Sequence, residues 1–400
     1  MTAGRLPPPS TVVGPRAWLR QNLFSGWLGS LVTILMAVAL AGLAWMLLGW
    51  ALFDARWGVV TANLRLFLMG TYPLGEAWRI WLCLAGLSIL SGLTAARVGR
   101  DSIRTLSDWL AIGQLLLAGL ALVSSMDLAV SVALAVNAGL VWGSHRVAVR
   151  FSPSGRWLSV AWLLSPIVAF ILLRGLGGGL LPIVEPGRWG GLLLTFVLSV
   201  SGIVLSFPFG VLLALGRRSS LPAVRFLSTA YIEIIRGVPL VAILFMAAIM
   251  LPLFLPAGLR IENVFRAIAG LTLFSAAYVA ENVRGGLQAI PQGQIEAAQA
   301  IGLGTLQTNL FIVLPQALRA VIPANVGLFI SLLKDTTLVA VAGTGLLELL
   351  GIGRSVTTQP DWIGAQVEVY IFISVVFFVL CFIMSRASYR LEDEMGIGTR

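Results

Sequence analysis

The run WGGLLLTFVLSVSGIVLSFPFGVLLAL, residues 189–215, contains no Asp, Glu, Lys or Arg. About 20 apolar residues in a helix are enough to cross the hydrocarbon core of a bilayer. Comparable apolar runs fill most of the rest of the chain, at about 28–53, 78–96, 106–124, 127–144, 157–174, 228–256, 263–284, 316–341 and 366–386. The sequence therefore predicts an all-α integral membrane protein with about ten transmembrane helices, within a range of eight to ten.

The composition agrees with this prediction. Of 400 residues, 58% are hydrophobic and 11% are charged, and the mean hydropathy is +0.94. A soluble domain carries about 25% charged residues. The net charge of +10 comes from arginines clustered between the apolar runs, which is the positive-inside pattern of cytoplasmic loops. We therefore predict a multi-pass membrane protein, in contact with membrane lipid, with both termini in the cytoplasm. No aromatic platform accompanies the charge, so we expect no nucleic-acid partner.

A change in composition near residues 175–187 divides the chain. Three glycines at 177–179, followed by Pro182 and Pro186, interrupt any helix there. We predict a cytoplasmic N-terminal tail at 1–27, a transmembrane extension of about five helices at 28–180, and a five-helix core at 189–390. The long cytoplasmic loop of the core spans 285–315. The segment from Asp54 to Ala77 is predicted to lie along the outer membrane interface.

The long loop contains a predicted short helix around Glu296. Residues 295–301 favour helix, and Gly302 and Gly304 end it. Such a helix can lie in a groove on a partner protein. The alternative is an ordinary amphipathic helix in a loop, with no partner.

The same loop resembles the EAA loop of permeases in ATP-binding-cassette (ABC) importers. The matching positions are Glu296, Ala297, Ala298, Gly302, Ile312, Leu314 and Pro315. The resemblance implies that this segment is the coupling helix seated on a separate ABC ATPase subunit, with Gly293 and Gln294 contributing at its start.

Further stretches are similar to polar amino-acid permeases, namely Tyr231–Leu240, Tyr278–Gln288 and Lys334–Leu338. With the loop they cover about 190–390. The long N-terminal half resembles that of the larger permeases of general L-amino-acid importers. The resemblance implies a type I ABC importer permease core with an N-terminal helical extension, in the bacterial inner (plasma) membrane.

The function that the resemblance implies is import of polar or broad-specificity L-amino acids by alternating access. It also implies three protein partners: the ATPase, a second permease and a periplasmic amino-acid-binding protein. We expect the second permease to be a distinct chain, and a homodimer is the alternative. A different polar substrate is the alternative to an amino acid.

Lys334 is the only lysine among 27 basic residues, and it follows an apolar run with Asp335 beside it. Charges at membrane depth often face a cavity on a substrate path. Our hypothesis is that Lys334 contacts the substrate carboxylate, and that Asp335, with Thr336 next to it, lies near the amino group or holds Lys334 in place. A structural ion pair is the alternative. Thr195 and Ser199 are further candidates for the path, although small polar residues in membrane helices often serve packing.

Two pairs of opposite charges lie three residues apart on one helix face. They are Glu281 with Arg284, and Glu233 with Arg236. We expect local pairs that shape the inner gate or are simply structural. The sequence from Arg236 to Pro239 predicts a bend where a helix enters the membrane.

The sequence lacks the motifs of a catalyst. Lys334 is followed by Asp335, so no P-loop exists, and no catalytic triad, carboxylate pair or metal-ligand spacing is present. We expect no enzyme activity, no metal and no cofactor in this chain, with ATP and Mg²⁺ on the partner ATPase. A secondary transporter is a competing hypothesis, but the extension lacks the acidic or histidine relays that it needs. An intramembrane enzyme is a third hypothesis.

Overall fold

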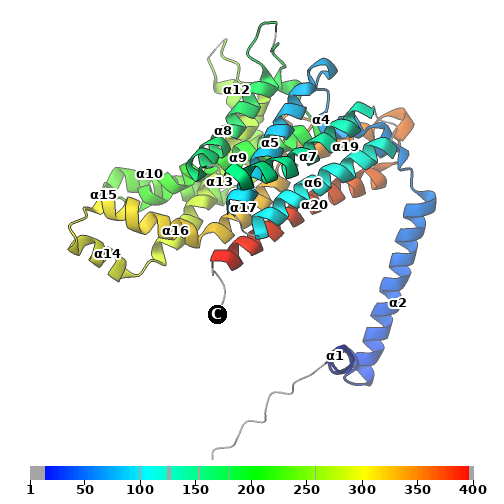
Figure 1. Ribbon diagram of the computed structural model, residues 1–400, viewed down its shortest axis with the longest axis horizontal. Helices are drawn as coiled ribbons and strands as arrows, with labels where there is room; N and C mark the ends of the chain where they lie inside the picture. The colour runs from blue at the N-terminus through cyan, green and yellow to red at the C-terminus, as the bar shows by residue number, and fades with distance from the viewer. Residues whose placement is uncertain are drawn as a thin grey trace, which may run out of the picture. The chain divides into compact units, whose positions relative to one another are not determined.

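The computed structural model of the chain describes residues 14–98, 101–123, 128–151, 154–179, 181–256 and 258–395 (Figure 1). The described residues form helices and short connections. The chain divides into two compact units, Met1–Trp57 and Gly58–Arg400.

The first unit contains one long apolar helix. α1 (Pro15–Asn22) precedes α2 (Trp27–Gly49), which continues into the π-helical turn η1 (Trp50–Asp54). No residue of α2 is buried, and Trp27–Asp54 is long and apolar enough to cross a membrane. A helix satisfies its backbone hydrogen bonds internally, so it can stand in lipid without protein neighbours.

The second unit begins with the helices of the predicted extension. Three short helices come first: α3 (Gly58–Ala62), α4 (Leu64–Met69) and η2 (Leu74–Glu76). Four long helices follow: α5 (Trp78–Val98), α6 (Asp101–Val123), α7 (Leu128–Phe151) and α8 (Gly155–Arg174). All four correspond to predicted apolar runs. A Cβ added at Gly92 would lie 2.1 Å from Ser144 Oγ, so glycine allows α5 and α7 to approach closely.

The core follows η3 (Pro186–Arg188) and contains fifteen further elements. They are α9 (Gly191–Arg217), α10 (Pro222–Gly237), α11 (Leu240–Phe245), η4 (Met246–Met250), α12 (Leu251–Phe254), α13 (Asn263–Gln288), α14 (Gln292–Ala300), α15 (Thr305–Gln307), η5 (Thr308–Val313), α16 (Leu314–Ala320), α17 (Ile322–Asp335), α18 (Leu338–Val341), α19 (Leu349–Val356) and, after η6 (Pro360–Trp362), α20 (Gln366–Met395).

α13 is the central helix of the core. It packs along α9, where Gly210 lies so close to Val279 that a Cβ on the glycine would be 2.5 Å from the valine Cβ. Small residues let two membrane helices touch along their backbones. The described residues contain eight helices that could span a membrane, or nine if the bent pair α10 and α11–α12 counts as one span. The predicted fold class and number of spans are confirmed.

Two predicted crossings are broken helices. The run 228–256 is formed by α10 and α11–α12, which meet at an angle of 104°. Val238 is extended there and Pro239 has no N–H to donate, so the predicted bend is confirmed. The run 316–341 is divided into α16, α17 and α18, with a first break at Val321 shortly before Pro323.

Two segments differ from the sequence expectations. The segment from Asp54 to Ala77 is predicted to lie along the membrane interface, but Val59, Phe67 and Tyr72 are fully buried in the protein. Phe67 contacts Phe372 of α20 edge-to-face. The second segment is α19, which the sequence analysis does not predict because eight residues are too few to span a membrane.

Candidate functional site

The segment with the predicted coupling residues is a short helix at one end of the second unit, opposite α4 and α19 (Figure 1). α14 ends at Gly302, whose φ of +86° lies in the left-handed region that favours glycine. Gly302 N donates to Gln299 O (2.9 Å) and Leu303 N donates to Ala298 O (3.1 Å). These two bonds form a Schellman motif, so the predicted helix and its stop at Gly302 are confirmed.

α14 turns one face toward the protein and leaves the other open. Ala298 is buried, and Ile295 packs against a cluster that includes Val283 and Ala317. The remaining predicted coupling residues are exposed: Gly293, Gln294, Glu296 and Ala297. The open face is therefore small and polar, with one carboxylate.

Large exposed apolar side chains follow α14 in the chain, and the sequence analysis does not single them out. Ile301 is 76% exposed, Leu306 72% and Phe311 68%. Apolar side chains that gather at an exposed end of a molecule are typical of a contact with another protein. The signal that could have found them is the interleaving of Ile301 and Leu306 with Gly302 and Gly304 in the predicted cytoplasmic loop.

α14 is joined to the next spanning helix through π-helical backbone. Gly304 N donates to Gln307 Oε1 (3.1 Å) at the start of α15, and η5 then leads into α16 at Pro315. π-Helical turns often occur at functional sites, since they loosen the regular hydrogen-bond ladder. The connection from α14 to α16 is therefore not one continuous α-helix, because it passes through the π-helical segment η5.

Five charged side chains form an ion network near the same end. Glu281 of α13 is its centre: Arg217 Nη1 and Arg236 Nη1 each lie 3.3 Å from Glu281 Oε2, and Arg284 Nε lies 2.8 Å from Oε1. Arg217 Nη2 also lies 2.9 Å from Glu233 Oε1. The network joins α9, α10 and α13.

The ion network agrees only partly with the expected local pairs. Glu281 and Arg284 do pair at three-residue spacing. Glu233 and Arg236, expected as a second local pair, instead bind Arg217 and Glu281 respectively. Arg217 follows an apolar run in the sequence, and only the packing of α9 beside α10 and α13 brings it to both carboxylates.

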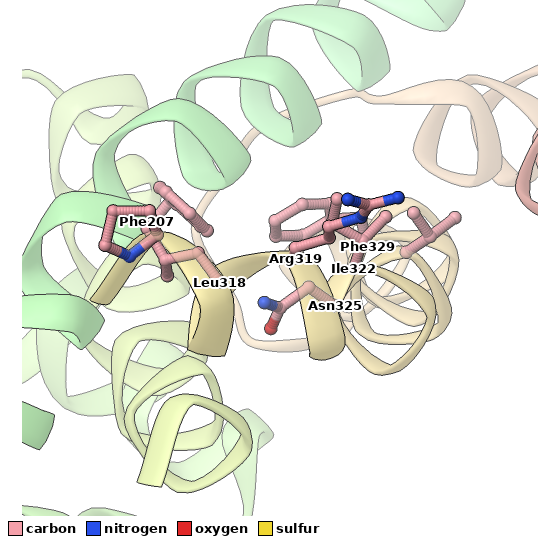
Figure 2. Close-up of a pocket in the computed structure, with 8 residues that line it drawn as sticks. Phe207, Leu318, Arg319, Ile322, Asn325 and Phe329 are labelled. Atoms are coloured by element: carbon pink, nitrogen blue, oxygen red, sulfur yellow. The ribbon is translucent and has the colours of Figure 1, made fainter. Parts of the chain in front are cut away.

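A groove of about 350 Å³ lies where α16 meets α17, against Phe207 of α9 (Figure 2). Its walls are mostly apolar and include Leu318, Ile322 and Phe329, with Arg319 on the rim. Asn325 is buried, and its Oδ1 accepts a hydrogen bond from Asn282 Nδ2 (3.0 Å). The sequence analysis does not single out Arg319 or Asn325.

Lys334 and Asp335 end α17, further along that helix than the groove. Lys334 is exposed, Asp335 is partly buried, and Thr336 is fully buried with its Oγ1 donating to Leu333 O (2.7 Å). An ammonium group exposed on a spanning helix needs a polar environment, which a cavity shared with another subunit would supply. The role of these residues in substrate contact stays a prediction.

Thr195 and Ser199 lie in the packed interior of α9. Thr195 Oγ1 donates to Gly191 O (3.1 Å) and accepts from Leu349 N (3.2 Å), so it fastens α19 to α9. Ser199 Oγ donates to Phe196 O (3.2 Å). These are the contacts of packing groups, and a place for either residue on a substrate path stays a prediction.

Glu348 is a buried acid outside the spanning helices that the sequence analysis does not single out. Its side chain is fully buried and caps α19, accepting from Leu350 N and Gly351 N at 2.9 Å each. Burial raises its pKa to about 7, and the two backbone N–H groups oppose that shift. Among the described residues, no three His, Cys, Asp or Glu side chains are grouped as a metal would require.

Comparison with known proteins identifies relatives over the whole length of the chain. Residues 206–396 match the family model described as "Binding-protein-dependent transport system inner membrane component". The chain is 36% identical to the inner membrane amino-acid ABC transporter permease protein YhdY of Escherichia coli (strain K12), with 98% of this chain and 96% of that protein covered. It is 38% identical to the glutamate/glutamine/aspartate/asparagine transport system permease protein BztC of Rhodobacter capsulatus, with 97% and 95% covered.

Among solved structures, "Crystal structure of an amino acid ABC transporter with histidines" matches with 29% identity and a TM-score of 0.46. The match covers 51% of this chain and 92% of that one.

Proposed function

Because the chain belongs to the family of binding-protein-dependent transport system inner membrane components, as an amino-acid ABC transporter permease, we propose that it forms the translocation pathway of an ATP-driven importer. The pathway opens alternately to the two sides of the inner membrane. A separate ATPase drives it, a second permease completes it, and a periplasmic binding protein delivers the amino acid.

One observation carries this proposal: α14 with its exposed surroundings. A short helix with Glu296 and Ala297 on its open face stands at the end of a membrane bundle, followed in the chain by exposed Ile301, Leu306 and Phe311. A partner surface that received α14 would cover these apolar groups and leave the polar helix face in a groove. That arrangement suits docking of an ATPase subunit.

The proposed mechanism follows from where α14 is attached. ATP can drive transport only by favouring one orientation of the pathway, since a ligand shifts a conformational equilibrium through differential affinity. Movement of the ATPase displaces α14, and this displacement is transmitted through η5 to α16 and α17. These helices line the groove and carry Lys334, the proposed contact for the substrate carboxylate. The chain itself binds no nucleotide, and ATP and Mg²⁺ stay on the partner.

A charge reversal at Glu296 tests the proposal. In proteoliposomes that contain the complete importer, we expect Glu296→Lys to abolish ATP-dependent amino-acid uptake, because the open face of α14 then carries the opposite charge. The ATPase should also dissociate more readily from the purified complex.

Glu185→Lys is the matched control. Glu185 is exposed between α8 and α9, away from α14, and the same change of charge there should leave uptake intact. Undiminished uptake by Glu296→Lys, or labelling of Glu296→Cys by a membrane-impermeant thiol reagent only from outside the cell, would overturn the proposal.

A further inference from the structure

α10 lies across the bundle rather than along it. α11 runs beside the N-terminal part of α13, because Leu240 and Leu244 pack in one cluster with Ile268 and Leu271. α10 meets α11–α12 at 104°, so it is nearly perpendicular to that direction. Since α13 spans the membrane, α10 is oriented close to the membrane plane.

The first turns of α10 lie at the level where α9 ends, whereas Tyr231 OH donates to Leu273 O (2.7 Å) near the middle of α13. Ser228 abuts Gly216, where a glycine Cβ would be 2.3 Å from the serine Oγ, and α9 ends one residue later at Arg217. α10 is at the same end of the second unit as α14 and α15 (Figure 1). That this end faces the cytosol rests on the proposed function.

The helix has three distinct faces. Ser228 and Ile232 are buried against α9 and α13. Phe226, Leu227 and Ile234 form an apolar stripe at helical spacing and are 70%, 66% and 63% exposed. A polar edge at a spacing of three to four residues separates these two faces, and it consists of Arg225, Thr229, Glu233 and Arg236.

One exposed guanidinium group lies on α10 and another lies at the end of α9, which packs on α10. Arg225 is exposed, with its Nε donating to Ser219 O (2.9 Å). Arg218 is also exposed and donates to Leu287 O from Nη1 (3.3 Å). A helix in the membrane plane with an apolar stripe and adjacent arginines has the pattern of an interfacial helix, which gains binding energy from acyl chains and from anionic headgroups together.

We propose that α10 is an interfacial helix that binds anionic phospholipid of the inner leaflet. Phe226, Leu227 and Ile234 enter the acyl-chain boundary, and Arg218 and Arg225 bind the headgroup phosphates. Lipid is favoured over a protein partner because the stripe begins at the level where α9 ends and exposed arginines lie on α10 and at the end of α9, which matches an anionic leaflet. Glu233 and Arg236 of the same helix belong to the ion network, so the bound lipid also holds that network in place.

The test is site-specific quenching by lipid. The full chain, purified with its accompanying subunits, carries Cys83→Ala and Cys381→Ala and a bimane label at Leu227→Cys. It is placed in nanodiscs containing brominated phosphatidylglycerol or brominated phosphatidylcholine. We expect both lipids to quench the label and phosphatidylglycerol to be preferred. Each arginine removed should lower that preference about fivefold, so Arg218→Gln with Arg225→Gln lowers it about 25-fold.

Arg150→Gln, in the last turn of α7, is the matched control and should leave the preference unchanged. If the double variant does not fold, Arg225→Gln alone gives the same test at about fivefold. A label that neither lipid quenches would mean that solvent or another subunit covers the stripe, and the proposal would be wrong. An unchanged preference in the arginine variants would also overturn it. The assay involves no ATP hydrolysis, so a failure of the coupling proposal does not alter its outcome.

Discussion

At the scale of single residues, Gly302 shows how backbone conformation rather than side-chain contact can determine a turn. No atom lies within 4 Å of the place where a Cβ would stand, but φ is +86°. Any other L-residue is strained there by about 1–2 kcal/mol, which disfavours the observed turn roughly 5- to 30-fold.

We therefore expect Gly302→Ala to reduce the ratio of amino acid imported to ATP hydrolysed in proteoliposomes, with normal assembly of the chain in the membrane. Gly143→Ala is the control, because Gly143 is an exposed residue of α7 with equal space and no positive φ. Equal coupling ratios in the two variants would show that the left-handed turn is not needed.

Glu348 predicts a dependence of stability on pH. Its pKa is about 7 in the folded protein, against about 4.5 ordinarily, so folding favours the protonated acid. The protonated Glu348 carboxyl therefore stabilises the folded protein fully below about pH 4.5, and this contribution is lost as the pH rises through about 7. The shift corresponds to roughly 3 kcal/mol.

Glu348→Gln keeps a neutral acceptor at the N-cap, so the variant should lose this part of the pH dependence. We expect its melting temperature to exceed that of the wild type increasingly from pH 5 to pH 8. Asp361→Asn, at an exposed acid of η6, is the control, and the difference between its melting temperature and that of the wild type should stay constant over this pH range. A constant difference between Glu348→Gln and the wild type across this range would contradict the assignment.

At the scale of secondary-structure elements, the ion network predicts unequal roles for its two carboxylates. Glu281 is approached by arginines from three helices, whereas Glu233 is approached by Arg217 alone and is more exposed, at 55% against 22%. Exposed pairs contribute about 0–1 kcal/mol because water screens them. A shared, less exposed carboxylate contributes more, about 1.5–3 kcal/mol.

Glu281→Gln should therefore lower the melting temperature more than Glu233→Gln does, and added salt should reduce the difference. A double-mutant cycle of Arg217→Gln with each carboxylate variant, measured by thermal unfolding, gives the interaction free energy of Arg217 with each carboxylate. Equal losses from the two carboxylates would show that the ion network is not centred on Glu281.

At the scale of the whole molecule, the predicted extension and core share one hydrophobic cluster. Tyr72 and Leu173, from the extension, are buried together with Val184, Trp189 and Leu194. Tyr72 OH donates to Leu173 O (2.9 Å), and a Cβ at Gly191 would lie 2.3 Å from Phe67 O. Removing the extension would expose this apolar surface at the start of α9, which costs about 25 cal/mol per Å².

A chain that begins at residue 189 should accordingly aggregate or melt at a lower temperature than one that begins at Gly58. Gly58–Arg400 is the matched comparison because it keeps the whole second unit. The measurement is fluorescence-detected size exclusion with thermal challenge. Equal stability of the two chains would mean that the composition change near residues 175–187 is a true domain boundary.

The sequence by itself determined the elements that depend on local pattern. Apolar runs long enough for a bilayer predicted the spanning helices, Pro239 predicted the bend after α10, and Gly302 predicted the end of α14. Each of these depends on residues close together in the chain. The spacing around Glu296 predicted a coupling loop in the same way, and that role stays a prediction.

Only the tertiary structure decided what depends on contacts between distant residues. Arg217 reaches Glu281 because α9 packs on α13 through Gly210. The two residues are far apart in the chain, so no pattern of neighbouring residues predicts their contact. The groove at Asn325 and the burial of Glu348 arise likewise where separate helices meet. In a bilayer nearly every helix is apolar, so hydropathy marks which segments span but not which faces touch.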